Sequence, residues 1–335
     1  MAVNANTIET YDSGNLLSRD LSAQYRIISP EETPFQQAIG VSGEEADQPH
    51  VEWPIVALAA PDDNNRVVEG DDAPPVDPAN MPVVVGNYTQ ISDKRVKASH
   101  TSEASEHDVG NIHRLAKQMA LKIREMKRDM EVMLLSNVAA NPGASGVARV
   151  AAGLPAWLRT NTLAGTGGAD PTLSGGTSGH PNVAAVAGTP RPLTEGMFND
   201  AIAEAWTTGG NPTIAFVTAG NKRLISDTFT GSATRYKDSV DKTLVNAVDV
   251  YDSDFGELSI VPNRFQPTLN PGGANNSHYV ALIDPDYLSV QFLETVRQKP
   301  LAETGHSRDR LVWAEYTLRS ENEAAHAIIR DLTNG

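Results

Sequence analysis

The sequence of 335 residues contains no cysteine, which excludes disulfide bonds and thiolate metal sites. No apolar run approaches the length of about eighteen residues that a membrane span requires. Residues 1–8 also lack the basic head and the apolar body of a signal peptide. We therefore expect a chain that is made in the cytoplasm, is not exported through a signal peptide and does not enter a membrane.

Motifs of nucleotide binding and of nucleophilic catalysis are missing as well. The chain has no phosphate loop of the form G-x-x-x-x-G-K-[ST] and no G-x-S-x-G motif. Gly165, Gly167 and Gly168 neither follow a strand pattern nor precede a helix pattern, as a phosphate-binding loop would. These absences argue against the nucleotide-binding proteins and the hydrolases that carry these motifs.

Side chains that hold metal ions elsewhere are poorly placed in this sequence. His107 and His113, the two histidines closest in sequence, are six residues apart and diverge on a helix. Asp252-Ser253-Asp254 and Asp284-Pro285-Asp286 each offer two carboxylates to a hard cation, but aspartate at such positions more often forms a turn. The sequence therefore predicts no catalytic, cofactor-binding or metal-binding residue, and hence no enzyme.

The charge balance is strongly acidic. The 42 Asp and Glu against 27 Lys and Arg give a formal net charge of −15 at pH 7. Most of the excess lies in the first third of the chain, in pairs such as Glu31-Glu32, Glu44-Glu45, Asp62-Asp63 and Asp71-Asp72. This balance opposes tight binding to nucleic acid through neutralised phosphates, and solvated loops account for most of the pairs.

A long hairpin without a core of its own is predicted in the first third of the chain. Val51–Leu58 and Val83–Ser92 have the β-branched and aromatic content of two paired strands, and the acidic, proline-rich stretch between them offers almost nothing to bury. At about 3.3 Å per residue, two arms of about twenty residues each would reach roughly 60 to 70 Å. Since an isolated hairpin is only marginally stable, we expect it to lie on another copy of the chain. Trp53 and Pro61–Pro82 are expected to serve that contact rather than the fold of the subunit.

An amphipathic helix is predicted from about residue 103 to 138. Lys127 and Glu131, four residues apart, and Lys122 and Glu125, three apart, are expected to form ion pairs on its solvent face. Its apolar and small residues recur in steps of three and four and so share one face. These residues are Ala116, Met119, Ile123, Met126, Met130 and Met133.

The chain before the hairpin is predicted to be an extended arm. A short helix near Asn15–Ile27 is expected, and Pro30 and Pro34 then hold the backbone open so that Phe35 and Ile39 can anchor the arm.

The segment after the long helix changes in composition. Asn141-Pro142-Gly143 is expected to end the helix, and residues 141–189 are rich in Gly, Ala, Ser and Thr, as in a loop or a flexible insertion. Leu154–Leu158 interrupts this stretch as an apolar anchor.

A more compact lobe is predicted from Leu193. Thr194 is expected to cap a helix that buries Met197, Phe198, Ala201, Ile202 and Ala205. The mixture of helices and strands predicts an α+β fold. A buried strand Thr213–Val217 and a helix Asn221–Thr228 are expected to follow. Two strand pairs are expected next, namely a hairpin of Leu244–Tyr251 with Leu258–Val261 and a pair of Tyr279–Ile283 with Tyr287–Leu293. The last elements expected are a strand Arg310–Arg319, which buries Val312, Ala314, Tyr316 and Leu318, and a closing segment Ala324–Leu332.

The order of these parts resembles the major capsid proteins of tailed bacteriophages with the HK97-type fold, and within them the SU10-like branch. The resemblance covers nearly the whole chain. The segments that carry it are Ile28–Phe35, Lys127–Glu131, Ala152–Trp157, Val248–Gly256, Val261–Phe265 and Leu301–Gly305.

The resemblance implies an N-terminal arm, an extended loop, a spine helix, a peripheral domain and an axial domain. The boundaries implied are 1–50 for the arm, 51–98 for the extended loop, 99–192 for the spine helix with part of the peripheral domain and the Gly-rich insertion, 193–300 for the axial domain, and 301–335 for the returning strand of the peripheral domain. In the family the extended loop of one subunit lies over the peripheral domain of its neighbour.

The function implied is that of a structural protein of the virion. The resemblance implies self-assembly into hexamers and pentamers that form an icosahedral head around phage DNA. A portal, with scaffolding and decoration proteins as further possible partners, is expected, as is at most weak contact with DNA. Some family members crosslink the loop through a lysine, but Val51–Asp93 contains none, and Lys94 and Lys97 lie only at its base. We expect a shell without covalent crosslinks.

Three other readings remain open from the sequence. The first is an encapsulin-like cellular compartment, which shares the fold and carries cargo. The second is an α+β hydrolase, for which only scattered Asp and His residues speak. The third is a tail or adhesin component of the same virion, which the Gly-rich middle would tolerate.

Overall fold

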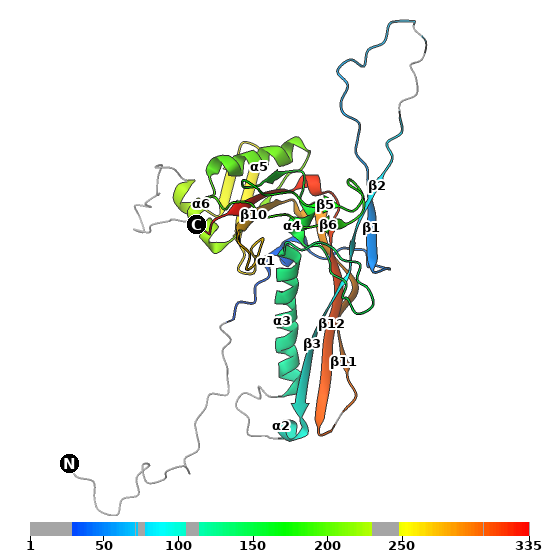
Figure 1. Cartoon of the computed structure of the whole chain (residues 1–335), viewed down its shortest axis with the longest axis vertical. Helices are drawn as coiled ribbons and strands as arrows, with labels where there is room; N and C mark the ends of the chain where they lie inside the picture. The colour runs from blue at the N-terminus through cyan, green and yellow to red at the C-terminus, as the bar shows by residue number, and fades with distance from the viewer. Residues whose placement is uncertain are drawn as a thin grey trace, which may run out of the picture.

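The computed structural model describes residues 29–70, 72, 78–104, 114–229, 248–303 and 305–334. Its helices and strands form a rounded upper part and an elongated lower part, and a loop projects above both (Figure 1). The upper part is built on a six-stranded sheet. In the order of pairing its strands are β4 (Thr162–Leu163), β13 (Ala327–Leu332), β10 (His278–Ile283), β7 (Ile214–Val217), β9 (Gly256–Pro262) and β8 (Val250–Ser253).

The centre of the six-stranded sheet is buried on both faces. Along β10, Tyr279, Ala281 and Ile283 belong to one hydrophobic core, whereas Val280 and Leu282 belong to a second core. This alternation follows from the strand geometry, in which successive side chains point to opposite faces. The continuous apolar sequence of β10 therefore reflects a strand covered on both sides.

Two helices cover one face of this sheet. α5 (Glu195–Thr207) begins at Thr194, whose side chain accepts a hydrogen bond from the Met197 amide, as predicted. α6 (Ala219–Thr228) begins at Thr218, which accepts a hydrogen bond from the Asn221 amide. The residues of α5 predicted to face inward are buried, apart from the partly buried Met197.

The elongated part consists of α3 (Leu115–Leu135) beside a three-stranded sheet. The sheet pairs β11 (Leu288–Pro300), β12 (Ser307–Ser320) and β3 (Gln90–Ser99) in that order, and α2 (His100–Ala104) follows β3 at its lower end. The helix and the strands run side by side down the molecule (Figure 1). All four residues predicted to face inward from β12 are fully buried, which confirms the prediction for that strand.

The long helix is shorter than predicted. Residues 105–113 lie outside the described part, and α3 begins at Leu115 after an extended Arg114. It ends at Leu135, because Ser136 is extended and donates through its amide and its hydroxyl to the Met133 carbonyl oxygen. The predicted end near residue 138 is thus three residues too late. Of the predicted apolar face, Met119, Met126 and Met130 are buried, Ile123 and Met133 are partly buried, and Ala116 is exposed.

The two ion pairs predicted on α3 have different outcomes. The Lys122 ammonium group lies 2.6 Å from a Glu125 carboxylate oxygen, as predicted. The predicted pair of Lys127 with Glu131 is wrong, because Glu131 is fully buried and accepts hydrogen bonds from backbone amides of the arm. Sequence spacing identified neighbours on the helix but not the partner that comes from elsewhere in the chain.

One predicted strand pair is wrong and another is correct. Tyr279–Ile283 and Tyr287–Leu293 do not pair, because β10 lies in the six-stranded sheet and β11 in the three-stranded sheet. The short 3-10 helix η3 (Pro285–Tyr287) turns the chain from one sheet to the other. The hairpin of β8 and β9 forms as predicted around Ser253 and Gly256, although residues 244–247 of the predicted strand lie outside the described part.

Residues 141–189 are packed rather than free. They contain α4 (Leu154–Trp157), β4, β5 (Thr172–Leu173) and β6 (Pro181–Val183), of which β5 and β6 pair with each other. The predicted anchor, Leu154–Leu158, is almost fully buried in the first core. The remaining elements are α1 (Pro34–Ile39), β1 (His50–Ile55), β2 (Val83–Tyr88) and the short 3-10 helix η4 (Glu323–Ala325).

Candidate assembly surface

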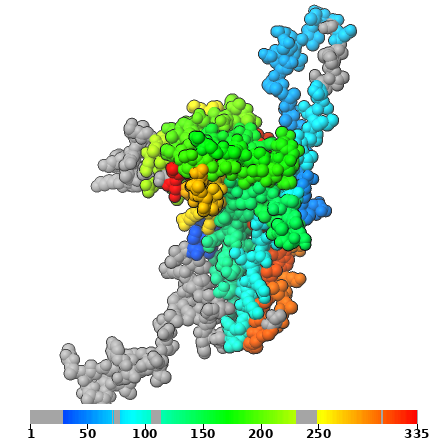
Figure 2. Space-filling view, in the orientation of Figure 1, coloured from blue at the N-terminus to red at the C-terminus, as the bar shows by residue number. Residues whose placement is uncertain are grey.

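The loop between β1 and β2 carries apolar side chains that the subunit does not cover. The antiparallel pairing ends at Ile55 and Val83, so residues 56–58 are not part of a strand, contrary to the prediction. Within the loop Leu58 is 88 % exposed, Val68 74 % and Met81 77 %. In Figure 2 the blue and cyan atoms of the loop rise well clear of the rest of the molecule. Exposed apolar side chains gathered on such a projection are typical of an interaction surface.

The root of this hairpin, by contrast, belongs to the subunit core. Trp53 is only 4 % exposed, its indole N–H donates to the Ser320 carbonyl oxygen at 2.9 Å, and its ring centroid lies 5.5 Å from that of Trp157. The Arg319 guanidinium lies 5.9 Å from the centre of the same ring. The expectation that Trp53 serves only assembly is therefore wrong, because the root of the hairpin packs on its own subunit rather than on another copy.

Two backbone hydrogen bonds, together called the clasp, join the root of the hairpin to the loop that precedes β6. The Gly86 amide donates to the Gly179 carbonyl oxygen at 3.0 Å, and the Gly179 amide donates to the Val84 carbonyl oxygen at 2.9 Å. A side chain at Gly86 would place its Cβ 2.6 Å from the Val51 carbonyl oxygen, so only glycine fits there. The clasp fixes the direction in which the projecting loop leaves the body.

Three aromatic rings surround this clasp. His50 stacks on Tyr88 with ring centroids 4.4 Å apart, and His180 meets the Tyr88 ring edge to face at 5.0 Å. Burial and the neighbouring His50 both hold the pKa of His180 below its usual value. The sequence analysis missed this cluster, because His180 lies more than ninety residues after Tyr88 and no local pattern connects them.

Charge is distributed unevenly between the loop and the elongated part. Residues 56–82 contain six Asp and Glu and one Arg. The four elements α3, β3, β11 and β12 contain 13 of the 27 Lys and Arg of the chain, against seven Asp and Glu. An acidic projection and a basic elongated part thus occur on one subunit whose total charge is −15.

The arm is fastened to the end of α3 by a buried carboxylate. Glu131 accepts the Phe35 amide at 2.8 Å, the Gln36 amide at 3.0 Å and the Asn263 side-chain amide at 2.7 Å. Phe35 is fully buried and meets the Phe216 ring edge to face at 5.4 Å. Phe35 and Ile39 therefore anchor the arm as predicted, although within a helix, α1, rather than an extended segment.

This junction brings together three of the segments on which the resemblance rests. The segments containing Phe35, Glu131 and Asn263 are distant in sequence but meet at one buried point. Sequence reasoning missed their contact, and the place of Glu131 directly after the buried Met130 was the signal that could have identified it. These segments therefore share a structural role in joining the arm to both parts of the molecule.

The Gly-rich segment near residue 165 serves packing. Asp331, which has a positive φ of 59° and is fully buried, accepts the Gly165 amide at 2.9 Å. A Cβ at Gly165 would lie 2.4 Å from the Thr189 carbonyl oxygen, and one at Gly168 would lie 2.9 Å from an Asp331 carboxylate oxygen. These glycines allow the loop to approach the C-terminal strand closely.

The candidate metal ligands are not assembled into a site. Asp284 accepts the Asp286 amide at 3.2 Å, which is the turn geometry that the sequence favoured. Ser253, rather than a carboxylate, closes the turn after β8 by accepting the Phe255 amide. His107 and His113 lie outside the described residues. Within the described ranges no three His, Asp or Glu side chains form a set of metal ligands.

The described helices include no candidate membrane span. None of them is both long enough and apolar enough to pass through a membrane.

Solved structures with the same arrangement define the class of protein. The chain is similar to the capsid of cyanophage A-1(L), with a TM-score of 0.65 and 14 % identity over 97 % of this chain and 100 % of that chain. It is also similar to the SrpI encapsulin of Synechococcus elongatus PCC 7942, with a TM-score of 0.55 and 9 % identity over 98 % of this chain and 97 % of that one. At such identities the likeness establishes the fold, which is the HK97-type fold of shell proteins.

The family is established by sequence. The family model of the SU10 major capsid protein matches residues 3–333, so the chain belongs to that family of capsid structural proteins. A curated relative, the major capsid protein of Escherichia phage Phieco32, is 37 % identical over 115 residues. That match covers 34 % of this chain and 31 % of the relative's length.

Proposed function

We propose that this chain is the major capsid protein of a tailed phage and that it assembles, through hexamers and pentamers, into an icosahedral head that encloses phage DNA. The observation that carries the proposal is the projecting loop, whose apolar side chains have no partner in the described part of the subunit. Burial of such side chains on a second subunit would supply the driving force for assembly. The family match and the fold support the same role.

The loop of each subunit is proposed to lie on the elongated part of a neighbour. The acidic loop and the basic elements α3, β3, β11 and β12 are complementary in charge, and complementary potentials steer association and fix its register. The elongated part and the loop are proposed to be the peripheral domain and the extended loop that the resemblance implies. The axial domain, near residues 193–300 but without β11, which lies in the elongated part, is proposed to meet its copies at the centre of each capsomer.

The contact is proposed to be non-covalent. The loop proper contains no lysine, and at its base Lys94 is held 2.5 Å from the Asp129 carboxylate. This ion pair holds the Lys94 side chain against its own subunit. Boiling assembled shells in detergent should release single chains, and a ladder of multimers on a denaturing gel would refute this part of the proposal.

Contact with packaged DNA is proposed to be weak, and no catalytic activity is expected of the subunit. The net charge of −15 opposes tight phosphate binding, even though the elongated part is basic. A nanomolar affinity of purified capsomers for duplex DNA at physiological salt would contradict this. Synthesis in the host cytoplasm, and association with a portal and with scaffolding or decoration proteins, remain predictions.

Electron microscopy of the expressed chain tests the proposal. We expect capsomers, closed shells or tubes, whereas a homogeneous monomer would contradict it. An encapsulin-like compartment is the second candidate, because an encapsulin shares the fold. Particles from infected cells that contain DNA support the phage head, and particles that contain a cargo enzyme support the compartment.

A pair of charge-reversal variants tests the role of the loop. Asp62→Lys with Asp63→Lys removes part of the acidic surface of the loop. Glu45→Lys with Asp47→Lys changes the net charge equally at two exposed positions before β1. The loop variant should fail to assemble at concentrations at which the control forms particles. Equal assembly of both variants would show that the charge of the loop does not guide docking.

A further inference from the structure

Where the chain leaves β1, it turns two apolar side chains away from the rest of the subunit. Ile55 and Ala57 line a cavity of about 180 Å³ together with Trp157 of the core. Val56 and Leu58, which alternate with them, are 57 % and 88 % exposed. This is the alternation of a strand, in which successive side chains point to opposite sides. Val56 and Leu58, called the outward pair, therefore face a possible partner together.

An apolar groove of about 470 Å³ lies on the elongated part, between β3 and residues 142–149. Ile91 of β3 is 58 % exposed and Val147 is 54 % exposed, although both are large apolar side chains. The other residues that line the groove within the described part of the chain are Pro142, Gly143, Ala144, Ala148 and Arg149, of which Arg149 alone is charged. The groove is thus an apolar surface that the described subunit leaves uncovered.

The walls of the groove are held in place by the fold. Ala144 and Val147 exchange backbone hydrogen bonds of 3.1 Å and 2.9 Å, which close the loop between them. Arg149 forms an ion pair with Glu315, and Glu315 lies opposite Ile91 in the register of β12 and β3. The ion pair therefore fastens residues 142–149 beside Ile91. A groove that is formed in advance costs little ordering when a partner binds.

The charges near the groove are balanced. They are the carboxylates of Asp93, Asp309 and Glu315 and the cations of Arg95, Lys97 and Arg149. Two of these carboxylates are held in ion pairs, Glu315 with Arg149 and Asp309 with Arg95. The groove therefore selects an occupant through its apolar side chains. Steering by charge comes from the elongated part as a whole, in which Lys and Arg outnumber Asp and Glu.

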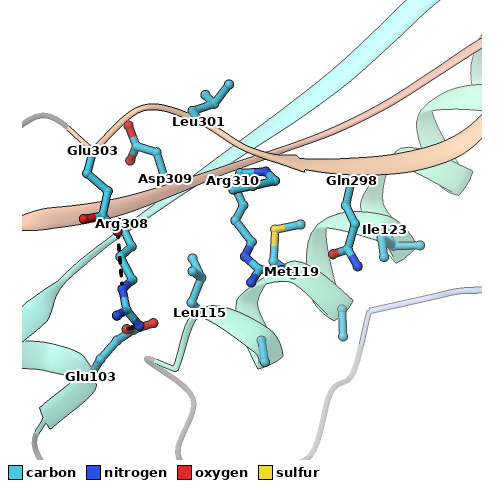
Figure 3. Close-up of a pocket in the computed structure, with 13 residues that line it drawn as sticks. Glu103, Leu115, Met119, Ile123, Gln298, Leu301, Glu303, Arg308, Asp309 and Arg310 are labelled. Atoms are coloured by element: carbon cyan, nitrogen blue, oxygen red, sulfur yellow. Dashed lines mark hydrogen bonds and ion pairs between the residues drawn. The ribbon is translucent and has the colours of Figure 1, made fainter.

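A larger cavity of the elongated part suits the outward pair less well. It measures about 620 Å³ and lies between the first turns of α3 and the ends of β11 and β12. In Figure 3 Arg308 lies between Glu103 and Glu303 at this cavity, and Arg310 extends from β12 toward the helix. Five charged residues line the cavity, and one lines the groove. Apolar side chains in the cavity would remove water from those charges, which is unfavourable.

The loop of a second copy has the chemistry that the groove requires. The outward pair is followed by Ala59, Ala60 and Pro61 and then by two aspartates, so an apolar stretch precedes an acidic one. The acidic loop is complementary to the basic elongated part that contains the groove. Within one subunit the loop projects away from the elongated part (Figure 1), so its own groove stays open to the loop of another copy.

We infer that the groove of one subunit receives the outward pair of a neighbour, with Leu58 seated between Ile91 and Val147. Burial of these exposed apolar side chains on one another removes them from water and stabilises the contact. This inference rests on the proposed function, because it names the place on the elongated part at which the neighbour's loop lies.

Disulfide formation in assembled particles tests the inference, because the natural chain has no cysteine. Leu58→Cys with Val147→Cys should crosslink neighbouring chains under mild oxidation, since a disulfide forms only where the Cα atoms come within about 7 Å. Leu58→Cys with Ala120→Cys, an exposed position at the larger cavity, is the matched comparison. We expect crosslinked multimers on a non-reducing gel to be about tenfold more abundant with Val147→Cys.

The outcomes separate the inference from the proposed function. Particles that crosslink through Ala120→Cys and not through Val147→Cys, or through neither, would overturn the inference and leave the proposed function standing. Equal crosslinking at both positions would also overturn it, because the loop would then have no defined seat. Failure of the natural chain to form particles of any kind would refute the proposed function itself.

A second readout needs no cysteine. Ile91→Ser with Val147→Ser should leave the urea midpoint of unassembled subunits unchanged, since both side chains are exposed there, and should lower the yield of particles about tenfold. Val183→Ser with Val186→Ser is the control, because these side chains are similarly exposed and lie outside the groove. A natural yield from the groove variant, or an equal loss in the control, would overturn the inference.

Discussion

Two segments of this chain have the composition of loops but differ in what they bury. Residues 141–189 are rich in Gly, Ala, Ser and Thr, and residues 56–82 are rich in Pro and Asp. The first places Leu154–Leu158 in the core and approaches Asp331 closely through Gly165, whereas the second exposes Leu58 and Met81 to solvent. Composition does not distinguish a packed loop from a projecting one. The two are distinguished by whether the loop has a partner in the core of the subunit.

This difference indicates that residues 141–189 contribute to the folding of the subunit and residues 56–82 to its assembly. The packed segment stabilises the subunit, because its side chains lose solvent contact when the chain folds. The projecting loop has no such partner, so its apolar side chains gain burial only from a second molecule. Substitutions in the two segments should therefore affect different measurements, namely the unfolding of the subunit and the formation of particles.

The largest effect is expected in the packed segment from Trp157→Ala. Trp157 is 2 % exposed and contacts the Trp53 ring, so its truncation leaves a cavity in the core. The free energy of unfolding should fall by about 3–5 kcal/mol, measured by urea denaturation of unassembled subunits. A loss below 1 kcal/mol would mean that the segment does not contribute to the core.

A smaller effect is expected from Gly165→Ala, because the added Cβ would lie 2.4 Å from the Thr189 carbonyl oxygen. Overpacking of this kind should lower the free energy of unfolding by about 1–3 kcal/mol. Gly196→Ala in α5 is the matched control, since nothing lies within 4 Å of its Cβ and alanine favours a helix. If both variants unfold at the same urea concentration, the close approach to Asp331 is not required.

A buried histidine beside the packed segment also predicts a pH dependence of stability, because the Asn161 side-chain amide donates to the His326 carbonyl oxygen. His326 is almost fully buried and accepts the Asp284 amide at Nδ1 at 3.1 Å, and burial lowers its pKa from 6.5 to about 3. The unfolded chain then binds a proton that the native chain rejects, so stability is full above pH 6.5 and falls as the pH decreases toward 3. Between pH 6.5 and 5.0 the loss is about 2 kcal/mol.

Urea denaturation at pH 7.5 and at pH 5.0 measures this loss, and His326→Asn is the control because it has no titrating group. The variant should lose about 2 kcal/mol less than the natural chain between the two conditions. The same dependence in both proteins would assign the effect to other groups, among which His180 and His278 also have lowered pKa values.

The smallest effect on unfolding is expected in the projecting loop. Leu58→Ser with Met81→Ser should change the free energy of unfolding by less than about 0.5 kcal/mol, because both side chains are exposed in the subunit. The same variant should reduce the yield of particles, counted by electron microscopy, at least tenfold. Destabilisation of the subunit by more than 1 kcal/mol would show that the loop packs on its own body.

The sequence was sufficient wherever local periodicity or capping decides the structure. The alternation of Val312, Ala314, Tyr316 and Leu318 predicted a buried strand, and Thr194 predicted the start of α5. These patterns depend on residues close in sequence, whose relation is fixed by the geometry of a strand or a helix.

The sequence was insufficient wherever a partner comes from far along the chain. Glu131 looked like a surface partner of Lys127, but its actual donors lie 96 and 132 residues away. Trp53 looked like part of the projection, but its hydrogen-bond acceptor lies 267 residues away. The pairing of β10 and β11 failed for the same reason, because turn residues do not specify whether the next strand returns to the same sheet.

The accessibility of the loop before and after assembly tests the central claim most directly. A single cysteine at Leu58→Cys or Met81→Cys, in a chain without other cysteines, can be labelled with a maleimide in free subunits and in purified shells. We predict rapid labelling in the subunit and at least tenfold slower labelling in the shell. Equal labelling rates in both states would contradict the claim that one subunit buries the loop of another.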